Sequence, residues 1–305
     1  MSDTLVEKFL QDGFVILEDF LNEEEVEELR KAGEALAENI PDNDIHTFKS
    51  GEEKRKDQYF LDSADKVSYF YETSVTENGN LDSNMNGDAE TGKTSAPRNL
   101  LNKVGHALHK HHPVFGRVAS STPVREICYR LGLEDPAIAQ SMYIYKNPKI
   151  GGEVLPHQDA SYLYAEPPSA LVGFWIALDD ATTKNGCLWF ASGSHKSGVH
   201  RRFMRTIDNT TGSNEVHLAY DSPAPSYPSS IFRPVPVKKG TCIVIHGLVL
   251  HKSDANTSND PRHAFTFHVL DQKGSKYSPS NWLQLPEGQS FVSLYSNKHN
   301  LPASN

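Results

Sequence analysis

The chain has 305 residues, of which 37% are hydrophobic and 23% are charged, and its formal net charge is −9. A chain of this size can bury one large core. The acidic balance argues against non-specific nucleic-acid binding, because phosphate contacts require a basic face. No apolar run is long enough to span a bilayer, so neither nucleic acid nor membrane is expected as a partner.

Three cysteines, Cys128, Cys187 and Cys242, are widely spaced and set among apolar residues. An odd number in such surroundings indicates reduced, buried thiols and therefore a reducing compartment. The first residues lack the basic and apolar regions of a signal peptide. The last four residues, 302–305, do not resemble a peroxisomal Ser-Lys-Leu signal, so we expect a cytoplasmic protein.

The first half of the chain predicts helices around a short strand. Residues 12–13, Asp-Gly, mark a turn into a strand over 14–17. Asn22 is the expected N-cap of a helix, with Glu25 at the capping-box position. The inner face of this helix is formed by Val26, Leu29, Gly33 and Leu36. Further helices are predicted over 101–111 and over 123–132, where Gly132 supplies the C-cap.

The second half predicts short strands separated by clusters of glycine, proline and asparagine. The strands are expected over 140–145, 170–178, 187–190, 240–245 and 264–270. This pattern favours a mainly β fold with flanking helices, built on a double-stranded β-helix, also called a jelly roll. We therefore expect one domain over 1–305, with helical support over about 1–135 and the β core over about 136–290.

Two polar segments, 72–98 and 206–230, lack core periodicity and are predicted to be surface loops. The second is either a lid over a site or a plain insertion. A basic cluster precedes it. This cluster is either a solvated loop or a rim that attracts an anionic substrate such as a CoA thioester. Its members are Lys196, Arg201, Arg202 and Arg205.

The tripeptide His157-Gln158-Asp159 is a candidate metal-binding motif. In an extended segment, residues two apart point the same way, so His157 and Asp159 could bind one ion. The segment 244–251 offers a third ligand, either His246 or His251. Two histidines and one carboxylate form the facial triad of non-haem Fe(II) oxygenases, which leaves positions open for co-substrate and O₂.

An arginine strengthens this interpretation. Arg262 follows His251 by eleven residues and precedes the last predicted strand. Its planar guanidinium can pair with a carboxylate through two hydrogen bonds, which suits the distal carboxylate of 2-oxoglutarate.

With these residues in place, the chain resembles the phytanoyl-CoA dioxygenase family of Fe(II)- and 2-oxoglutarate-dependent enzymes. The resemblance runs nearly end to end and rests on several separate blocks in one order. The blocks are FLQDGFVILEDFL at 9–21, NKVGHALH at 102–109, QSMYI at 140–144, NGCLWF at 185–190, GSH at 193–195 and NWLQ at 281–284.

The resemblance also implies roles for particular residues. The family's distal histidine stands eleven residues before the co-substrate arginine, which implies that His251 completes the metal site. His246 is then a core residue or one that orients a ligand. The resemblance further implies that 2-oxoglutarate contacts Lys103, Met142, Trp175, Ser253 and Arg262 beside the metal ligands His157 and Asp159. From the residues alone, Lys103 would be a solvated lysine on a helix, and Met142 and Trp175 would be core.

The activity implied by the resemblance is hydroxylation of an unactivated C–H bond. Fe(II), 2-oxoglutarate and O₂ are the expected cofactors, ascorbate is expected to stimulate, and succinate and CO₂ are released. Asp159 fills the position that related halogenases leave to halide, which favours hydroxylation. The substrate is expected to be a small molecule, lipid-like or acyl-CoA-like, and the protein a monomer or weak oligomer.

Two other functions remain open. Two histidines and a carboxylate also suit a zinc hydrolase, and the same fold could serve as a non-catalytic sensor of metal or 2-oxoglutarate. The intact ligands and Arg262 argue against both. The remaining histidines have no ligand spacing and are expected to be surface or packing residues: His106, His109, His111, His112 and His217.

Overall fold

The computed structural model describes residues 4–41, 57–72, 100–207 and 216–295. Its larger sheet has eight strands in the order β1-β12-β7-β14-β4-β3-β2, with β16 beside β4. These strands are Phe14–Leu17 (β1), Val67–Tyr71 (β2), Leu101–His106 (β3), Pro136–Ile144 (β4), Leu171–Ala177 (β7), Cys242–His246 (β12), Ala264–Asp271 (β14) and Val292–Ser293 (β16). Neighbouring strands in this sheet are antiparallel.

A smaller antiparallel sheet has the order β11-β8-β13-β5. Its strands are Val154–His157 (β5), Leu188–Phe190 (β8), Arg233–Val235 (β11) and His251–Ser253 (β13). Two further pairs join Phe203–Ile207 (β9) to Val216–Tyr220 (β10), and Ala165–Glu166 (β6) to Lys276–Tyr277 (β15). The strands expected in the second half are confirmed, and the two sheets form the predicted jelly roll.

The α-helices in the described part of the chain are short, apart from one. They are Thr4–Asp12 (α1), Glu23–Glu38 (α2), Gln58–Asp62 (α3), Leu108–His111 (α5), Pro113–Ala119 (α6) and Thr122–Arg130 (α7). Single 3₁₀ turns are Ser63–Asp65 (η1), Asp159–Ser161 (η3), Pro168–Ala170 (η4), Ser194–Ser197 (η5) and Ser229–Ile231 (η6). None of the described helices has the length and apolar character needed to cross a membrane.

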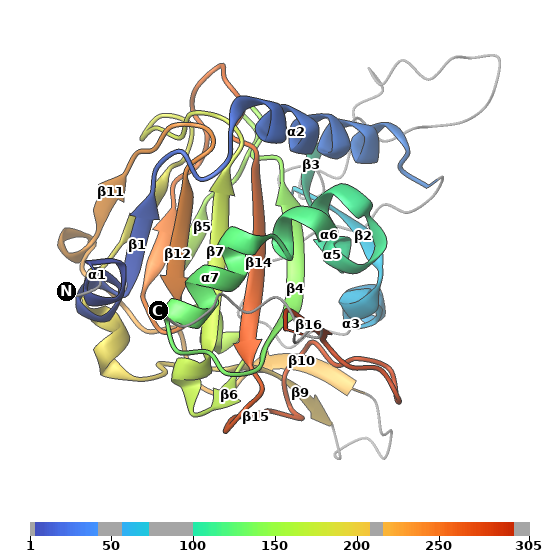
Figure 1. Ribbon diagram of the computed structural model, residues 1–305, viewed down its shortest axis with the longest axis vertical. Coiled ribbons are helices and arrows are strands. Elements are labelled where there is room, and N and C mark those ends of the chain that lie inside the picture. Colours follow the sequence, from blue (N-terminus) through green and yellow to red (C-terminus); the bar gives the residue numbers. More distant parts are fainter. Residues whose placement is uncertain (1–3, 42–56, 73–99, 208–215, 296–305) are drawn as a thin grey trace.

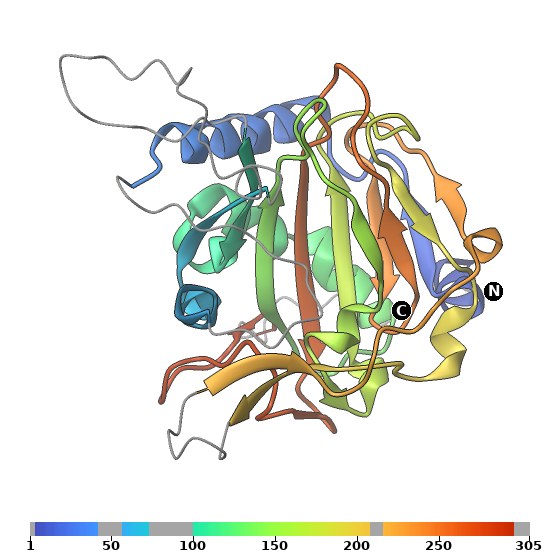
Figure 2. The same cartoon turned by 180° about the vertical axis from the view of Figure 1, so that it is seen from behind.

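Helices α2, α6 and α7 cover one face of the larger sheet (Figure 1). Phe115 of α6 and Ile127 of α7 belong to the same buried cluster as Phe265 and Phe267 of β14. Side chains alternate along a strand, so the other residues of β14 point away from these helices, toward the smaller sheet. The β9–β10 pair lies at the opposite end of the sheets from α2 (Figure 2).

Helix α2 begins as the sequence predicts. The Glu25 N–H donates to Asn22 Oδ1 at 3.0 Å, and the Asn22 N–H donates to Glu25 Oε2 at 2.9 Å, which completes a capping box. The helix packs very closely on β4 at Gly33. A methyl group on Gly33 would lie 2.1 Å from Cζ of Tyr143, so only glycine fits this contact.

The predicted helix over 101–111 is wrong. Leu101–His106 is strand β3, which pairs with β2 on one side and β4 on the other, and only Leu108–His111 is helical. Leu101, Val104 and Leu108 have helical spacing, but hydrogen bonds to two neighbouring strands outweigh that local preference. The helix predicted over 123–132 is confirmed, and Gly132 has the positive φ of a C-terminal cap.

The two predicted loops have different outcomes. Nearly all of 72–98 lies outside the described residues, and its first residue, Glu72, is buried. The prediction of a loop over 206–230 is wrong in part. The described segments 203–207 and 216–220 pair as strands β9 and β10, in which Phe203 and Leu218 are buried.

Gly33→Ala is expected to destabilise the protein by about 1–3 kcal/mol, because Tyr143 must move to accept the methyl group. In an unobstructed helix the same change would stabilise by about 0.5–1 kcal/mol. Urea denaturation measures the difference. Lys31→Ala, an exposed position on the same helix, should change stability by no more than about 0.5 kcal/mol. A stabilised Gly33→Ala protein would refute the close contact.

Candidate metal centre

Two histidines lie side by side where the strands of the smaller sheet pair. His157 ends β5 and His251 begins β13, and the two are direct partners in the register, with ring centroids 4.2 Å apart. Asp159 begins turn η3 two residues after His157. Its Oδ1 lies 3.6 Å from Nε2 of each histidine. These three side chains offer ligand atoms that lie within 4.8 Å of one another, so they could hold a metal ion.

Both histidines are oriented for this role by carbonyl groups two residues earlier in the chain. Nδ1 of His157 lies 2.8 Å from the Leu155 carbonyl, and Nδ1 of His251 lies 3.1 Å from the Val249 carbonyl. A carbonyl only accepts, so each Nδ1 carries the proton and each Nε2 presents its lone pair toward Asp159. Burial, together with His251, lowers the pKa of His157 to about 4, so this ring is neutral at pH 7.

A third histidine, His268 of β14, contacts the other oxygen of the carboxylate. Its Nε2 lies 3.2 Å from Asp159 Oδ2. Although burial disfavours the charge, His251 and His268 hold the pKa of Asp159 below its usual range. Because His268 occupies Oδ2, Oδ1 is the oxygen left to face the two ligand histidines.

The three candidate ligands open into a cavity of about 430 Å³ between the two sheets. The larger sheet contributes side chains from β3, β4, β7 and β14, and the smaller sheet contributes β5, β8 and β13. All of the residues predicted to bind the co-substrate line this cavity: Lys103, Met142, Trp175, Ser253 and Arg262. The structure therefore brings the whole predicted set together.

Arg262 is a buried cation directed into this cavity. It is 1% exposed, and its Nε and Nη1 have no hydrogen-bond partner among the described residues. Its guanidinium carbon lies 5.3 Å from the ring centre of Trp175. Burial lowers the pKa of Arg262 to about 10, so it stays charged at neutral pH. Buried donors without partners are costly, and a bound carboxylate would satisfy them.

The other predicted co-substrate residues come from strands. Lys103 lies on β3 and not on a helix, with its Nζ 5.6 Å from the ring centre of Phe70. Met142 faces the cavity from the adjacent strand β4. The Ser253 hydroxyl donates to the Gly186 carbonyl at 2.9 Å. This hydroxyl would have to rotate before it could donate to a carboxylate.

Sequence reasoning missed several charged or ionisable residues that line the cavity, among them Glu72, Lys146 and His268. Burial, together with the charge of Arg262, lowers the pKa of Lys146 to about 7, and its Nζ donates to the Gly152 carbonyl at 2.7 Å. The sequence carried one signal for Lys146 and His268: in a strand every second side chain faces the same way, and two series of even-numbered residues line the cavity. They are Gln140, Met142, Ile144 and Lys146, and Arg262, Thr266 and His268.

His246, the other candidate for third ligand, is not among the residues that line the cavity. Its ring packs against Phe9 and His195, and its Nδ1 accepts the Leu248 N–H at 3.1 Å. His246 is therefore a core residue, which is one of the two roles that the sequence predicts for it. Of the histidines expected to be packing residues, His106 is fully buried against Phe60 and Trp282 and also lines the cavity.

The members of the basic cluster have separate environments. Arg205 and Lys196 donate to backbone carbonyls, and Arg202 donates to the hydroxyls of Ser278 and Ser280. Only Arg201 of this cluster lines the cavity, with its guanidinium carbon 3.8 Å from the ring centre of Tyr220.

An aromatic wall, defined here as Tyr162, Phe203 and Tyr220, connects Arg201 to the metal centre. The hydroxyls of Tyr162 and Tyr220 lie 2.9 Å apart. Tyr162 presents an edge to the His157 ring at 5.9 Å between centroids. Phe203 and Tyr220 come from β9 and β10, so Tyr220 brings the described part of the predicted 206–230 loop to the cavity.

The fold matches that of several solved enzymes. The non-heme alpha ketoglutarate dependent epimerase SnoN from nogalamycin biosynthesis superposes with a TM-score of 0.61 at 17% identity, covering 94% of this chain and 91% of that one. EctD from S. alaskensis, with 2-oxoglutarate and 5-hydroxyectoine, gives 0.56 at 18% identity, covering 88% and 76%. The fold is therefore the jelly roll of non-haem, 2-oxoglutarate-dependent oxygenases.

The family model for phytanoyl-CoA dioxygenase matches residues 9–264, and the chain belongs to that family. Phytanoyl-CoA dioxygenase domain-containing protein 1 of Danio rerio is 41% identical over 303 residues, 97% of this chain and 99% of that protein. A homolog of that protein in Caenorhabditis elegans is 39% identical, covering 95% and 98%. Phytanoyl-CoA dioxygenase of Arabidopsis thaliana is 38% identical, covering 90% and 91%.

Replacing each candidate third ligand separates their roles. His251→Ala is expected to weaken Fe(II) binding by more than about a hundredfold, beyond the loss typical of residues that only orient ligands. His246→Ala should change Fe(II) affinity by less than about threefold, yet destabilise the fold by about 1–3 kcal/mol, because the Leu248 N–H loses its acceptor. Anaerobic Fe(II) titration and urea denaturation measure the two quantities. The opposite ranking of metal affinities would overturn the assignment.

Proposed function

We propose that this protein is an Fe(II)- and 2-oxoglutarate-dependent dioxygenase that hydroxylates a small molecule and releases succinate and CO₂. One observation carries the proposal. The His157, Asp159 and His251 side chains converge in the same cavity as the buried Arg262, whose Nε and Nη1 have no partner among the described residues. This is the arrangement needed for a metal with open positions and a dicarboxylate that reaches it.

In this proposal the chain's own residues bind and orient the reactants. His157, Asp159 and His251 hold the metal, and Arg262 pairs with the far carboxylate of 2-oxoglutarate. Lys103 and Lys146 add positive charge to the same cavity. When bound, the iron together with 2-oxoglutarate and O₂ supplies the oxidising power for C–H hydroxylation.

The donor set also suits zinc, but Arg262 favours the oxygenase over a hydrolase. A zinc hydrolase needs no buried cation that awaits a carboxylate, and membership of the phytanoyl-CoA dioxygenase family supports the same choice. A non-catalytic sensor would need the metal ligands and Arg262 but not the aromatic wall beside them. The aromatic wall therefore favours an enzyme that binds a further substrate.

The far end of the cavity supports a substrate with an apolar body and an anionic group. Phe60, Leu163 and Trp282 join the aromatic wall around the metal centre, and Arg201 adds a cation at that end. Such a lining suits a lipid-like or acyl-CoA-like molecule, in keeping with the names of the relatives. Apolar side chains would also exclude water from the reacting carbon.

Purified protein with Fe(II) and ascorbate is expected to convert 2-oxoglutarate to succinate, slowly alone and faster with a substrate. Asp159→Ala should abolish the conversion, and Arg262→Ala should raise the KM for 2-oxoglutarate by more than about a hundredfold, because a charge-assisted bidentate pair is lost. Succinate measured by mass spectrometry decides this. Activity with zinc and none with Fe(II) would favour a hydrolase, and 2-oxoglutarate binding without turnover under every substrate tried would favour a sensor.

Arg201→Met is expected to raise the KM for an anionic, apolar substrate by about tenfold with little change in kcat, because one charge-assisted contact is lost. Phytanoyl-CoA, the free acid and the corresponding alcohol are suitable probes. Lys196→Met is the matched control, since Lys196 bonds to the Gln11 carbonyl and does not line the cavity. Equal changes of KM in the two variants would contradict a role for Arg201. So would an equal change of KM for the alcohol and for the acid in Arg201→Met.

A further inference from the structure

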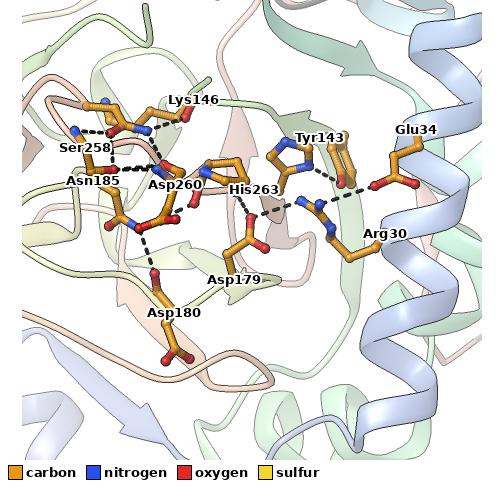
Figure 3. A network of polar contacts seen from close by, with 12 residues as sticks. Arg30, Glu34, Tyr143, Lys146, Asp179, Asp180, Asn185, Ser258, Asp260 and His263 are labelled. Carbon is orange, nitrogen blue, oxygen red and sulfur yellow. Dashed lines mark hydrogen bonds and ion pairs between the residues drawn. The ribbon is translucent and has the colours of Figure 1, made fainter. Parts of the chain in front are cut away.

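A polar network joins Arg30 of helix α2 through Asp179 to His263, the residue that follows Arg262 in the chain (Figure 3). Arg30 of α2 donates through Nη1 to Asp179 Oδ2 at 3.0 Å and through Nη2 to Glu34 at 3.2 Å. The same oxygen of Asp179 accepts the backbone N–H of His263 at 2.7 Å. Helix α2 lies outside the cavity, so this network connects the surface of the molecule to the residue that follows Arg262.

The backbone around Arg262 is held on both sides. The Arg262 N–H donates to the Lys146 carbonyl at 3.3 Å, and the His263 carbonyl accepts the Leu178 N–H at 3.0 Å. With the Asp179 bond to the His263 N–H, the peptide groups before and after the Arg262 Cα each have a fixed partner.

The turn that leads into Arg262 is fixed as well. Asn256 Nδ2 donates to the carbonyls of Lys146 and Asp260, at 2.9 and 2.8 Å. Asn185 Nδ2 donates to the Asp180 carbonyl at 2.8 Å and reaches the Pro261 carbonyl at 3.4 Å. Of all these anchors, the Asp179 carboxylate is the one that depends on a cation from another layer of the fold.

Two features indicate that the Asp179 carboxylate affects the cavity, beyond its role in attaching helix α2 to the sheet. The Arg262 Nε and Nη1 have no hydrogen-bond partner among the described residues, so the hydrogen bonds of its backbone, together with the Trp175 ring 5.3 Å from its guanidinium carbon, direct this side chain. Asp179 is also close enough for its charge to favour the charged form of Arg262, while burial raises the pKa of Asp179 and the charges of Arg30 and Arg262 oppose that rise. Arg30 shares that carboxylate and so limits how far Asp179 can turn toward Arg262.

We propose that Arg30 and Asp179 are positioning residues that set the affinity of the cavity for the distal carboxylate of 2-oxoglutarate. This inference rests on the proposed function. Arg30 holds Asp179 against the His263 N–H, and that bond places Arg262. Without Arg30, the Asp179 carboxylate is free to swing toward Arg262, where it would compete with the dicarboxylate for the same donors.

The test is direct binding of 2-oxoglutarate to the Fe(II)-loaded protein without oxygen, followed by isothermal calorimetry. Arg30→Met is expected to raise the Kd for 2-oxoglutarate by about tenfold, the loss of roughly one charged hydrogen bond at the cavity, and to leave the Kd for Fe(II) within about twofold. Arg30→Lys should recover part of the affinity because the charge is kept. Lys31→Met is the matched control and should leave both constants unchanged, since Lys31 is exposed and pairs with the exposed Glu27 on the same helix.

A second variant checks that the two residues act as one unit. Asp179→Asn keeps an acceptor for the His263 N–H but loses the charge, and adding Arg30→Met to it should cause little further loss of affinity. Additive losses, or an unchanged Kd for 2-oxoglutarate in an Arg30→Met protein with lowered unfolding temperature, would sink the inference. If the wild-type protein bound Fe(II) but no 2-oxoglutarate, the proposed function would fail and this inference with it. If the wild-type protein binds 2-oxoglutarate and the variants bind it with the same Kd, this inference fails and the proposed function stands.

Discussion

The alternation of side chains along β14 is the constraint on which the site depends. Phe265 and Phe267 pack under the helices, while Thr266 and His268 face the cavity from the same strand. A shift of one residue in the pairing of β14 with β4 and β7 would exchange these two sets. The buried aromatic residues therefore fix the register, and the register fixes where His268 and Arg262 stand relative to Asp159.

Opposite charges are placed at separate points of the cavity. Asp159 lies among three histidines, of which His268 contacts its Oδ2 and favours its negative charge although the carboxylate is buried. Arg262 keeps its positive charge on the same side of β14, six residues before His268. Burial makes each charge costly in isolation, and a metal at one point and a carboxylate at the other would compensate both. The cavity is thus electrostatically suited to a ligand that joins a cation to Arg262.

Much of the fold and of the candidate site could be predicted from the sequence, for identifiable reasons. The His157 and Asp159 pair, the second-half strands and the α2 capping box are local patterns, each readable within a few residues. The family's spacing to Arg262 favoured His251, which the structure places beside Asp159, whereas His246 lies in the core. Strand β3 was missed because its stability comes from two neighbouring strands and not from its own residues. His268 was missed because its importance depends on a contact between distant segments.

The hydrogen bonds that orient His157 and His251 have a further consequence. Each imidazole is tied to the carbonyl two residues earlier in its own chain segment, so neither ring relies on the other, on Asp159 or on an ion for its direction. The rings do not have to lose rotational freedom when a cation arrives, and the entropic cost of ordering them is met during folding. Metal could therefore enter and leave this protein without any rearrangement of the two strands, in contrast to small domains whose folding requires the ion.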